Sequence, residues 1–284
     1  AIGFSDITKK DLEMILDEVI TRPEIMKITK DSEGNEFAEL SGSFAANAGI
    51  TVRGTYQEDD SFHMDYYYPY VFGTSITTNE QIDVEKHAEK ESYAGVCDEV
   101  NLGVTLIFYI QNVADYLAET NRHLSKIHYG AMLAGLSTEG KILCPVVERK
   151  KNDVPAIQKN DRHNQLIAQA REGDEDAIES LTLEDMDTYA LLSQRVMKED
   201  IFSIVKSTFM PFGIESDQYT VLGEIIDCVT MENKLTHEKL YGMKLLCNNI
   251  QFDVCINEKD LLGEPAIGRR FRGNVWMQGN LCLE

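Results

Sequence analysis

The chain has 284 residues and a formal net charge of −21, from 27 basic and 48 acidic side chains. Its 43% hydrophobic and 26% charged residues are typical of a globular protein and argue against a disordered chain. Affinity for nucleic acids comes mainly from Lys and Arg, so the acidic balance disfavours nucleic-acid partners and anionic membrane surfaces.

The cysteines and the hydropathy pattern indicate a reducing, aqueous compartment. The chain has six cysteines, no C-x-x-C pair, and mostly apolar residues around them, as at Cys144 and Cys255. This is typical of buried free thiols, whereas extracellular proteins usually pair their cysteines. No run of 18 apolar residues is present, so we expect a cytoplasmic protein without a membrane partner.

The first predicted element is a helix that begins after Thr8. Asp11 lies three residues later, which is the spacing of a capping box. Apolar residues then recur at helical spacing, and Arg22 ends the helix because it precedes Pro23.

After this helix the pattern changes to strands and turns. A second helix is predicted to begin after Asn112. Two short candidate strands flank a turn at 31–35, and further strand patterns lie at 50–56, 62–66, 102–110, 129–136 and 141–147. We therefore predict that residues 1–147 form an α+β domain with a mostly antiparallel sheet and helices.

Residues 148–212 are predicted to form a helical connector segment. Its first part, 148–161, is polar and locally basic, which favours a domain boundary there. Eight acidic and no basic residues lie between positions 172 and 187. Acidic residues in the first turns of helices complement the helix dipole, which accounts for part of this run.

Residues 213–284 are predicted to form a small β module. The strand patterns are at 219–229, 239–247, 250–256 and 271–277, separated by turns and glycines. Several short strands in so short a segment favour a curled sheet or barrel, and an OB-like barrel is one candidate. SH3-like barrels and open meanders have similar patterns.

Three stretches carry a resemblance to a known family. They are AREGDEDAIESLT at 170–182, FMPFG at 209–213 and GRRFRGNVWMQG at 268–279. With them, the chain resembles a family of uncharacterised cytoplasmic proteins of gut clostridia, known only as a domain of unknown function. The resemblance implies a cytoplasmic protein and transfers no catalytic residue.

The motifs of common enzyme and cofactor sites are missing from the sequence. It contains no phosphate-binding glycine loop and no H-E-x-x-H pair. Only His123 and His128 lie close together, at a spacing that does not place both on one helix face. We therefore predict no catalytic residue, no cofactor and no metal site.

Tyrosines at alternate positions form the first candidate binding surface. Tyr66, Tyr68 and Tyr70 share one face if residues 66–70 are extended. An exposed face of this kind stacks on a ligand or a partner, and Pro69 favours an edge strand. The alternative is an amphipathic strand that covers the sheet, with its hydroxyls reaching solvent.

Two arginines near the C-terminus form the second candidate. Arg270 and Arg272 share a face of a strand and favour contact with an anion or a nucleic acid, with Trp276 as a stacking surface. The alternative is that they pair with the acidic run at 172–187.

The sequence as a whole favours a non-catalytic intracellular binding or regulatory protein. Its partner would be an unidentified small molecule or protein, and nucleic acid is the least favoured partner. The alternative is an enzyme that acts on a small metabolite at a site between the domains. Oligomeric state is left open.

Overall fold

The computed structural model describes residues 1–86, 90–122, 128–146 and 205–283, and the single positions 166, 169, 174, 177 and 180. Residues 1–143 and 207–284 form one compact unit, and residues 144–206 form a second. Of the described residues, 56% lie in strands and 13% in helices, so the protein is mostly β. The predicted α+β class is thus confirmed only in part.

Helix α1 (Lys9–Thr21) begins where the sequence predicts it. The Thr8 hydroxyl accepts from the Asp11 N–H, and the Asp11 carboxylate accepts from the Thr8 N–H. The capping box is therefore complete, because both ends of the motif are satisfied locally. The buried face of the helix consists of Ile15, Leu16 and Val19.

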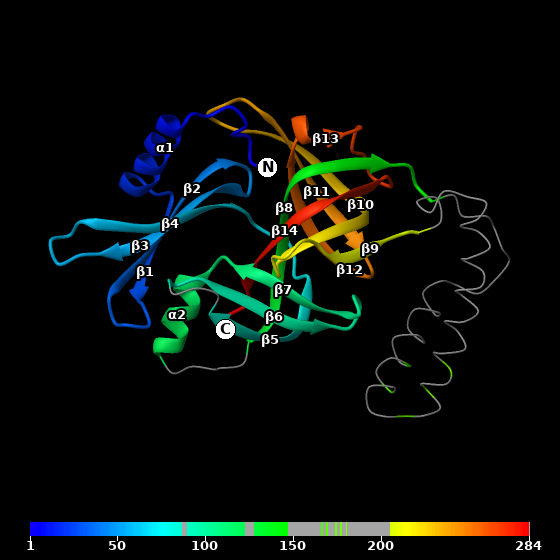
Figure 1. Ribbon diagram of the computed structural model, residues 1–284, viewed down its shortest axis with the longest axis horizontal. Helices are drawn as coiled ribbons and strands as arrows, with labels where there is room; N and C mark the ends of the chain where they lie inside the picture. The colour runs from blue at the N-terminus through cyan, green and yellow to red at the C-terminus, as the bar shows by residue number, and fades with distance from the viewer. Residues whose placement is uncertain are drawn as a thin grey trace. The chain divides into compact units, whose positions relative to one another are not determined.

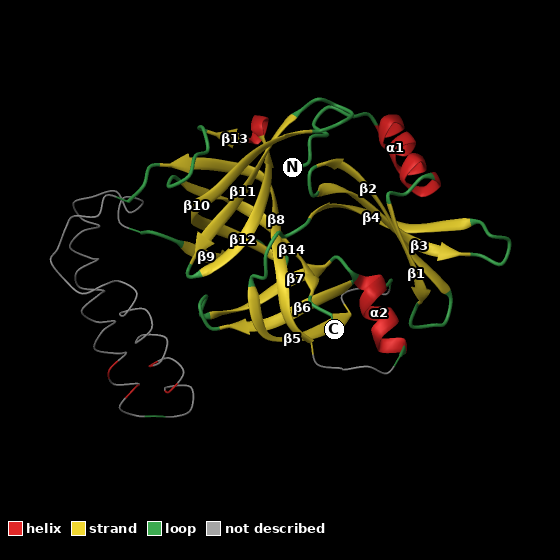
Figure 2. Cartoon of the chain, turned by 180° about the vertical axis from the view of Figure 1, so that it is seen from behind, coloured by secondary structure: helices red, strands yellow, loops and turns green. Residues whose placement is uncertain are grey.

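A four-stranded antiparallel sheet follows α1 (Figures 1 and 2). Its strands lie in the order β1 (Ile25–Lys30), β2 (Glu36–Ala45), β3 (Ala48–Tyr56) and β4 (Phe62–Val71). The turn between β1 and β2 needs Gly34, whose φ of 93° lies in the left-handed region that side chains disfavour.

The second sheet is mixed and has ten strands. In chain order its elements and those between them are β5 (Thr78–Lys86), β6 (Tyr93–Glu99), β7 (Val104–Ile110), α2 (Val113–Asn121), β8 (His128–Leu143), β9 (Thr208–Pro211), β10 (Gln218–Glu232), β11 (Lys239–Cys247), β12 (Ile250–Asn257), the 3₁₀ turn η1 (Glu258–Asp260), β13 (Leu261–Leu262) and β14 (Arg270–Leu281).

Strands β8 and β14 form the central pair of this sheet. They pair antiparallel from Leu143 opposite Arg270 to Ala131 opposite Leu281. Two closed circuits of strand pairing share them. One runs β8–β14–β10–β11–β12 and back to β8, and the other runs β8–β14–β7–β6–β5 and back to β8. In Figure 1 the shared strands β8 and β14 are green and red, β10 to β12 run from yellow to orange, and β5 to β7 are teal.

Two apolar cores hold this unit together. The larger one lies within the mixed sheet and includes Phe108, Val221 and Phe271. The smaller one contains the buried face of α1, apolar residues of β2 and β3, and Leu136 and Cys255 from the mixed sheet. The four-stranded sheet is therefore packed against the mixed sheet.

The C-terminal strands differ from the predicted arrangement. Strands β12 and β14 pair with β8, so residues from both 1–147 and 213–284 contribute to one sheet. No separate sheet forms from 213–284 among the described residues, because β8 supplies the ladder partner for both strands. The predicted helical segment 148–212 lies mostly outside the described residues, and its end at Thr208–Pro211 is strand β9, paired with β10.

Candidate ligand-binding site

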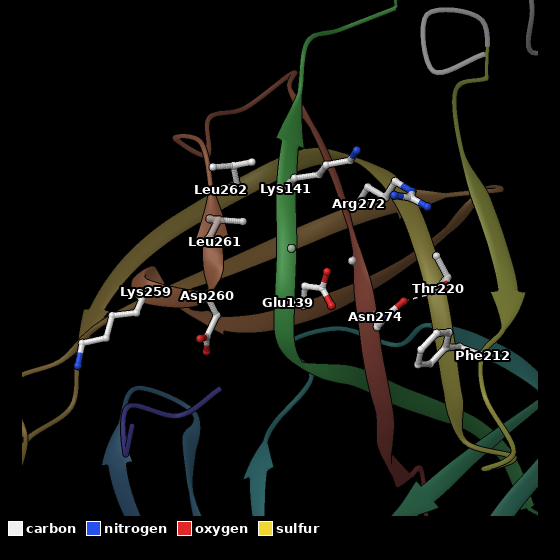
Figure 3. A pocket seen from close by; sticks show the side chains of 12 residues that line it. Glu139, Lys141, Phe212, Thr220, Lys259, Asp260, Leu261, Leu262, Arg272 and Asn274 are labelled. Carbon is white, nitrogen blue, oxygen red and sulfur yellow. Dashed lines mark hydrogen bonds between the residues drawn. The ribbon is translucent and has the colours of Figure 1, made fainter. Parts of the chain in front are cut away.

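The mixed sheet carries a hollow of about 530 Å³ over β8 and β14, which we call the β8–β14 hollow (Figure 3). Strands β13 and β10 flank it. The side chains that line it are Glu139, Lys141, Phe212, Thr220, Lys259, Asp260, Leu261, Leu262, Arg272 and Asn274. Its size falls within the range of roughly 300–1,000 Å³ that is common for small-molecule sites.

Two glycines allow close packing beneath the hollow. Gly140 on β8 stands directly opposite Gly273 on β14. A Cβ atom on either one would collide with the ring of Phe271, which is fully buried beneath them. Because side chains alternate between the faces of a strand, Glu139 and Lys141 lie on the opposite face, toward the hollow.

A polar ladder crosses β8 and β14 in the hollow. Lys141 stands opposite Arg272, and Glu139 stands opposite Asn274. The Thr220 hydroxyl donates to the Asn274 Oδ1 at 2.7 Å and so fixes that amide. Like charges directly opposite each other destabilise a sheet, and an anion beside them offsets the repulsion. The ladder is therefore suited to a carboxylate or a phosphate.

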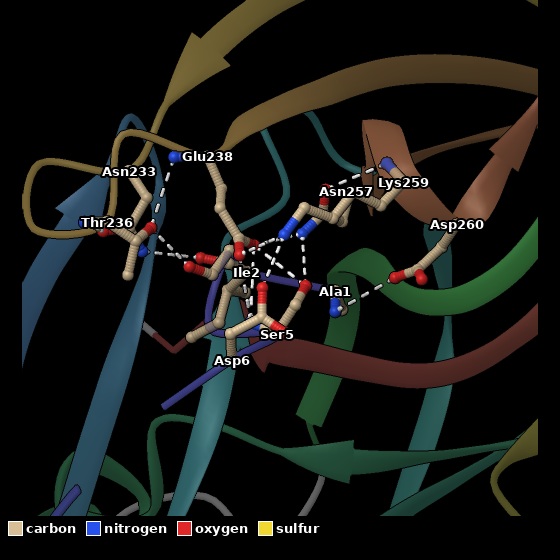
Figure 4. Close-up of polar contacts among 11 residues, drawn as sticks. Ala1, Ile2, Ser5, Asp6, Asn233, Thr236, Glu238, Asn257, Lys259 and Asp260 are labelled. Carbon is tan, nitrogen blue, oxygen red and sulfur yellow. Dashed lines mark hydrogen bonds and ion pairs between the residues drawn. The ribbon is translucent and has the colours of Figure 1, made fainter. Parts of the chain in front are cut away.

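A second set of polar contacts fixes the wall of the hollow at η1 (Figure 4). The Lys259 ammonium lies 2.9 Å from both the Asp6 and the Glu238 carboxylates. The Ser5 hydroxyl and the Asn257 amide also donate to Glu238, at 2.9 and 2.5 Å. Burial acts against the charge of Glu238, but these hydrogen bonds lower its pKa below the ordinary value. Lys259 is thus held at the wall by its ion pairs.

The structure separates the two predicted arginines. Arg272 lines the hollow, whereas Arg270 is buried and does not line it. Arg270 stands opposite Leu143 on β8 and Glu224 on β10. The anion-binding role of both arginines stays a prediction. Their alternative pairing with the acidic run at 172–187 concerns residues that lie almost entirely outside the described part.

The predicted tyrosine face of β4 points into the protein. Tyr68 and Tyr70 are buried and Tyr66 is half-buried. Arg53 donates to the hydroxyls of Tyr66 and Tyr68, each at 3.0 Å. Tyr70 lies apart, with its hydroxyl 3.1 Å from that of Ser43. A ligand-binding role for these tyrosines stays a prediction, and the contacts that the structure shows are internal.

The tyrosines belong to a buried polar cluster that we call the sheet junction, made of Glu39, Arg53, Tyr66, Tyr68 and Tyr109. Arg53 is 0% exposed and lies 2.8 Å from the Glu39 carboxylate. It also donates to the Tyr109 hydroxyl at 2.9 Å and to the Ile110 carbonyl at 3.1 Å, both on β7. The sheet junction therefore links the four-stranded sheet to the mixed sheet.

Burial controls protonation at the sheet junction. It raises the pKa of Glu39 against the attraction of Arg53, and it raises the pKa values of Tyr68 and Tyr109 far above their ordinary range. Burial also works against the charge of Arg53, but Tyr68 and Glu39 raise its pKa well above the ordinary value. The tyrosines are therefore neutral hydrogen-bonding groups around a permanent cation.

The sheet junction was not predicted from the sequence, although one signal for it exists. Glu39 follows and precedes apolar residues, and Arg53 follows one, so alternation places both charges on the strand face opposite to those neighbours. They stand directly opposite each other on β2 and β3. Opposite charges at such positions of a hairpin predict an ion pair once the register is known, and its burial is seen only in the structure.

Trp276 is a packing residue in this structure. Its indole N–H donates to Asp217 at 2.7 Å, and its ring packs against Tyr68 and Tyr109 with centroids 6.5 and 5.4 Å away. Its predicted use as a stacking surface for a ligand therefore has to compete with these contacts.

Metal ligands do not gather in the described ranges. No group of three or more His, Cys, Asp or Glu side chains there could hold a metal ion. His128 lies 3.8 Å from Glu119, and His123 falls outside the described residues. Among the described helices, none combines the length and the apolar character needed to cross a membrane.

One protein family matches almost the whole chain. Its model is described as DUF3881, a domain of unknown function with an E. rectale gene description, and it covers residues 1–279. This confirms the resemblance that the sequence motifs indicate. No curated protein and no solved structure matches the chain significantly. Because the match extends over far more than half of its length, the chain belongs to the DUF3881 family.

Proposed function

We propose that the protein is a non-catalytic binding protein that holds a small anionic molecule in the β8–β14 hollow. The observation that carries this proposal is the position of Lys141 directly opposite Arg272 in the floor of that hollow. Both cations belong to rigid strands, which preorganises them for one anionic group. Arg offers a planar fork to a carboxylate or phosphate, and Lys adds a point charge.

Apolar side chains beside the cations define the rest of the ligand. Leu262 is 75% exposed and Phe212 is 41% exposed, and both line the hollow. Asn274 adds an amide between the charged and the apolar parts. A molecule with a phosphate or carboxylate at one end and an apolar or aromatic part at the other, such as a nucleotide, matches this arrangement.

The circuit β8–β14–β10–β11–β12 supports the finer part of the fold prediction. We infer that this circuit is the small, OB-like barrel, with β8 taken from the N-terminal part of the chain. Each of its five strands pairs with two others in the circuit, which is the pairing a closed sheet requires. The cytoplasmic location is supported by the cysteines, all six of which are free thiols.

Thermal denaturation of the full chain with a ligand panel tests the function. ATP, AMP and glucose 6-phosphate are compared with adenosine and glucose. A ligand at about 100 times its Kd stabilises the folded state by roughly 2.7 kcal/mol, which is a shift of several degrees in Tm. We expect at least one anionic compound, and neither neutral one, to raise Tm.

Charge-matched variants locate the binding. We expect Lys141→Gln and Arg272→Gln each to reduce the ligand-induced shift in Tm, whereas Lys10→Gln, an exposed lysine on α1, leaves it unchanged. The proposal fails if no anion shifts Tm, or if the double variant responds to the anion as the wild type does.

Two other functions stay predictions. An enzyme that acts on a small metabolite would need a reacting group, and the described lining of the hollow holds two carboxylates, Glu139 and Asp260. A nucleic-acid contact would use the same cations, against the overall charge of −21.

A further inference from the structure

We propose a second site, unrelated to the hollow: an extended acidic peptide docks as an added strand along the outer edge of β1, in the groove between β1 and α2. Strand addition of this kind uses backbone hydrogen bonds for affinity and side-chain pockets for specificity. Four features support this site: the edge position of β1, the outward direction of its free backbone groups, the groove beside it and the charge of that groove.

Strand β1 lies at the end of the four-stranded sheet. Among the described strands it pairs only with β2. The Asp31 N–H donates to the Asn35 carbonyl across the β1–β2 turn, and the register continues without a shift from there to Ile25. Because antiparallel ladders alternate, the N–H and C=O groups of Met26 and Ile28 point away from β2.

Contacts with α2 agree with this alternation of inward and outward backbone groups along β1. The Asn121 side chain donates to the Lys30 carbonyl at 2.8 Å, so that carbonyl does face away from β2. The Lys27 side chain points to the opposite face of the sheet from those of Met26 and Ile28. Its ammonium lies 2.6 Å from the Asp115 carboxylate of α2. Helix α2 is thus fixed beside β1, as Figures 1 and 2 both show.

A groove of about 600 Å³ runs between these elements. Ile28, Thr29 and Lys30 form one wall, and Ala118, Asn121 and Arg122 contribute the other. Ala118 contributes only a methyl group to the helix side, whereas Asn121 reaches across the groove to the Lys30 carbonyl. Met26 and Ile28 are therefore the positions left for an added strand.

Two apolar side chains of β1 are exposed at this edge. Met26 is 49% exposed and Ile28 is 45% exposed. Natural proteins commonly protect such edges with lysines or bulges. Lys30 is such a lysine at the end of β1, whereas Lys27 is turned toward Asp115 and leaves Met26 and Ile28 uncovered. The two apolar side chains are therefore available as neighbours for the side chains of an added strand.

Charge selects the partner. Lys30 and Arg122 lie on opposite walls of the groove, with Glu36 as the one acidic residue among those that line it. The groove is therefore locally positive on a chain of net charge −21. An acidic peptide gains attraction there, whereas a second copy of β1 brings the same positive charge as the first.

Fluorescence anisotropy with the full chain tests the proposal. The probe is a fluorescein-labelled octapeptide of alternating Glu and Val, at low salt. We expect saturable binding that weakens with salt, and none with the Lys–Val analogue or with a Glu–Pro analogue that cannot pair. Absence of saturable binding of the Glu–Val peptide up to millimolar protein overturns the proposal.

Variants of β1 distinguish strand addition from simple charge attraction. Ile28→Pro removes an outward N–H and no ladder bond to β2, so we expect a folded protein that binds at least about tenfold more weakly. Ile28→Val is the matched control with unchanged affinity, and Arg122→Gln should weaken binding a few-fold. Equal affinity of Ile28→Pro and wild type contradicts the proposal.

Hydrogen exchange gives a readout that does not depend on the proline variant. Bound peptide should protect the amides of Met26 and Ile28, which point outward, and leave that of Lys27 unchanged. A peptide-free dimer that Ile28→Pro abolishes, seen by light scattering, would instead assign this edge to a second copy.

Discussion

Arg53 at the sheet junction and Arg272 in the β8–β14 hollow place the same side chain in opposite surroundings. Arg53 is 0% exposed, and its guanidinium contacts a carboxylate, three hydroxyls and backbone carbonyls. Arg272 lies in the floor of the β8–β14 hollow, opposite Lys141. The first arrangement satisfies the donors of Arg53 within the protein, while the second places Arg272 beside Lys141 and Glu139 in the lining of the hollow. Stability should therefore depend on Arg53, and ligand affinity on Arg272.

Replacing Arg53 should have the largest effect on stability. Arg53→Met leaves the Glu39 carboxylate buried without its cation, which costs about 3–5 kcal/mol of unfolding free energy. Urea denaturation measures this, with a smaller loss expected for Arg272→Met, because Arg272 is half-buried in the lining of the hollow and not fully buried. The double variant Arg53→Met, Glu39→Leu should recover part of the loss. Similar effects of the two single variants would remove the contrast between the regions.

A smaller effect is expected at the β7 side of the sheet junction. Tyr109→Phe removes one hydroxyl that accepts from Arg53, and hydrogen bonds to charged groups contribute roughly 1.5–3 kcal/mol. The matched control is Tyr67→Phe, whose ring is exposed on β4 and should be nearly neutral. If both variants unfold at the same urea concentration, the junction contributes less than its contacts imply.

The smallest expected effect concerns stability at acid pH and comes from Glu91. The backbone carbonyl of Glu91 accepts from the Tyr66 hydroxyl at the edge of the sheet junction. Burial would raise the pKa of Glu91, but hydrogen bonds from Ser32, Tyr93 and Lys86 lower it below the ordinary value of about 4.5. Glu91 therefore stabilises the fold above that pH, and this contribution is lost as the pH falls through the lowered pKa.

The Glu91→Gln variant isolates this contribution. We expect it to be less stable than wild type at pH 7 and to approach wild type as the pH falls below about 4.5. Unfolding curves at a series of pH values measure the difference. A difference between the two proteins that grows toward acid pH would contradict the direction of the shift.

Local signals in the sequence were sufficient for part of the fold. The start of α1 follows from Thr8 and Asp11, which lie within one helical turn of each other. Strand β7 follows from one continuous apolar run. Such features need no knowledge of distant residues, so a single sequence carries them.

The features that the sequence did not predict depend on pairing between distant segments. Strand β14 stands beside β8, and only this register brings Lys141 opposite Arg272. Alternation in β4 shows that Tyr66 and Tyr68 share a face, but not that Arg53 lies against that face. The same ladder explains why residues 213–284 do not form their own sheet, since β8 supplies the neighbouring strand.

The sharing of β8 and β14 by two circuits has a consequence for how the chain matures. Strand β14 comes after every other described strand, so both rings of hydrogen bonds lack a member until residues 270–281 have been synthesised. Until then, the strand edges of β7, β8 and β10 that later pair with β14 keep their backbone N–H and C=O groups unpaired in the nascent chain. The final strand closes both rings together, which ties the two halves of the sheet into one cooperative event.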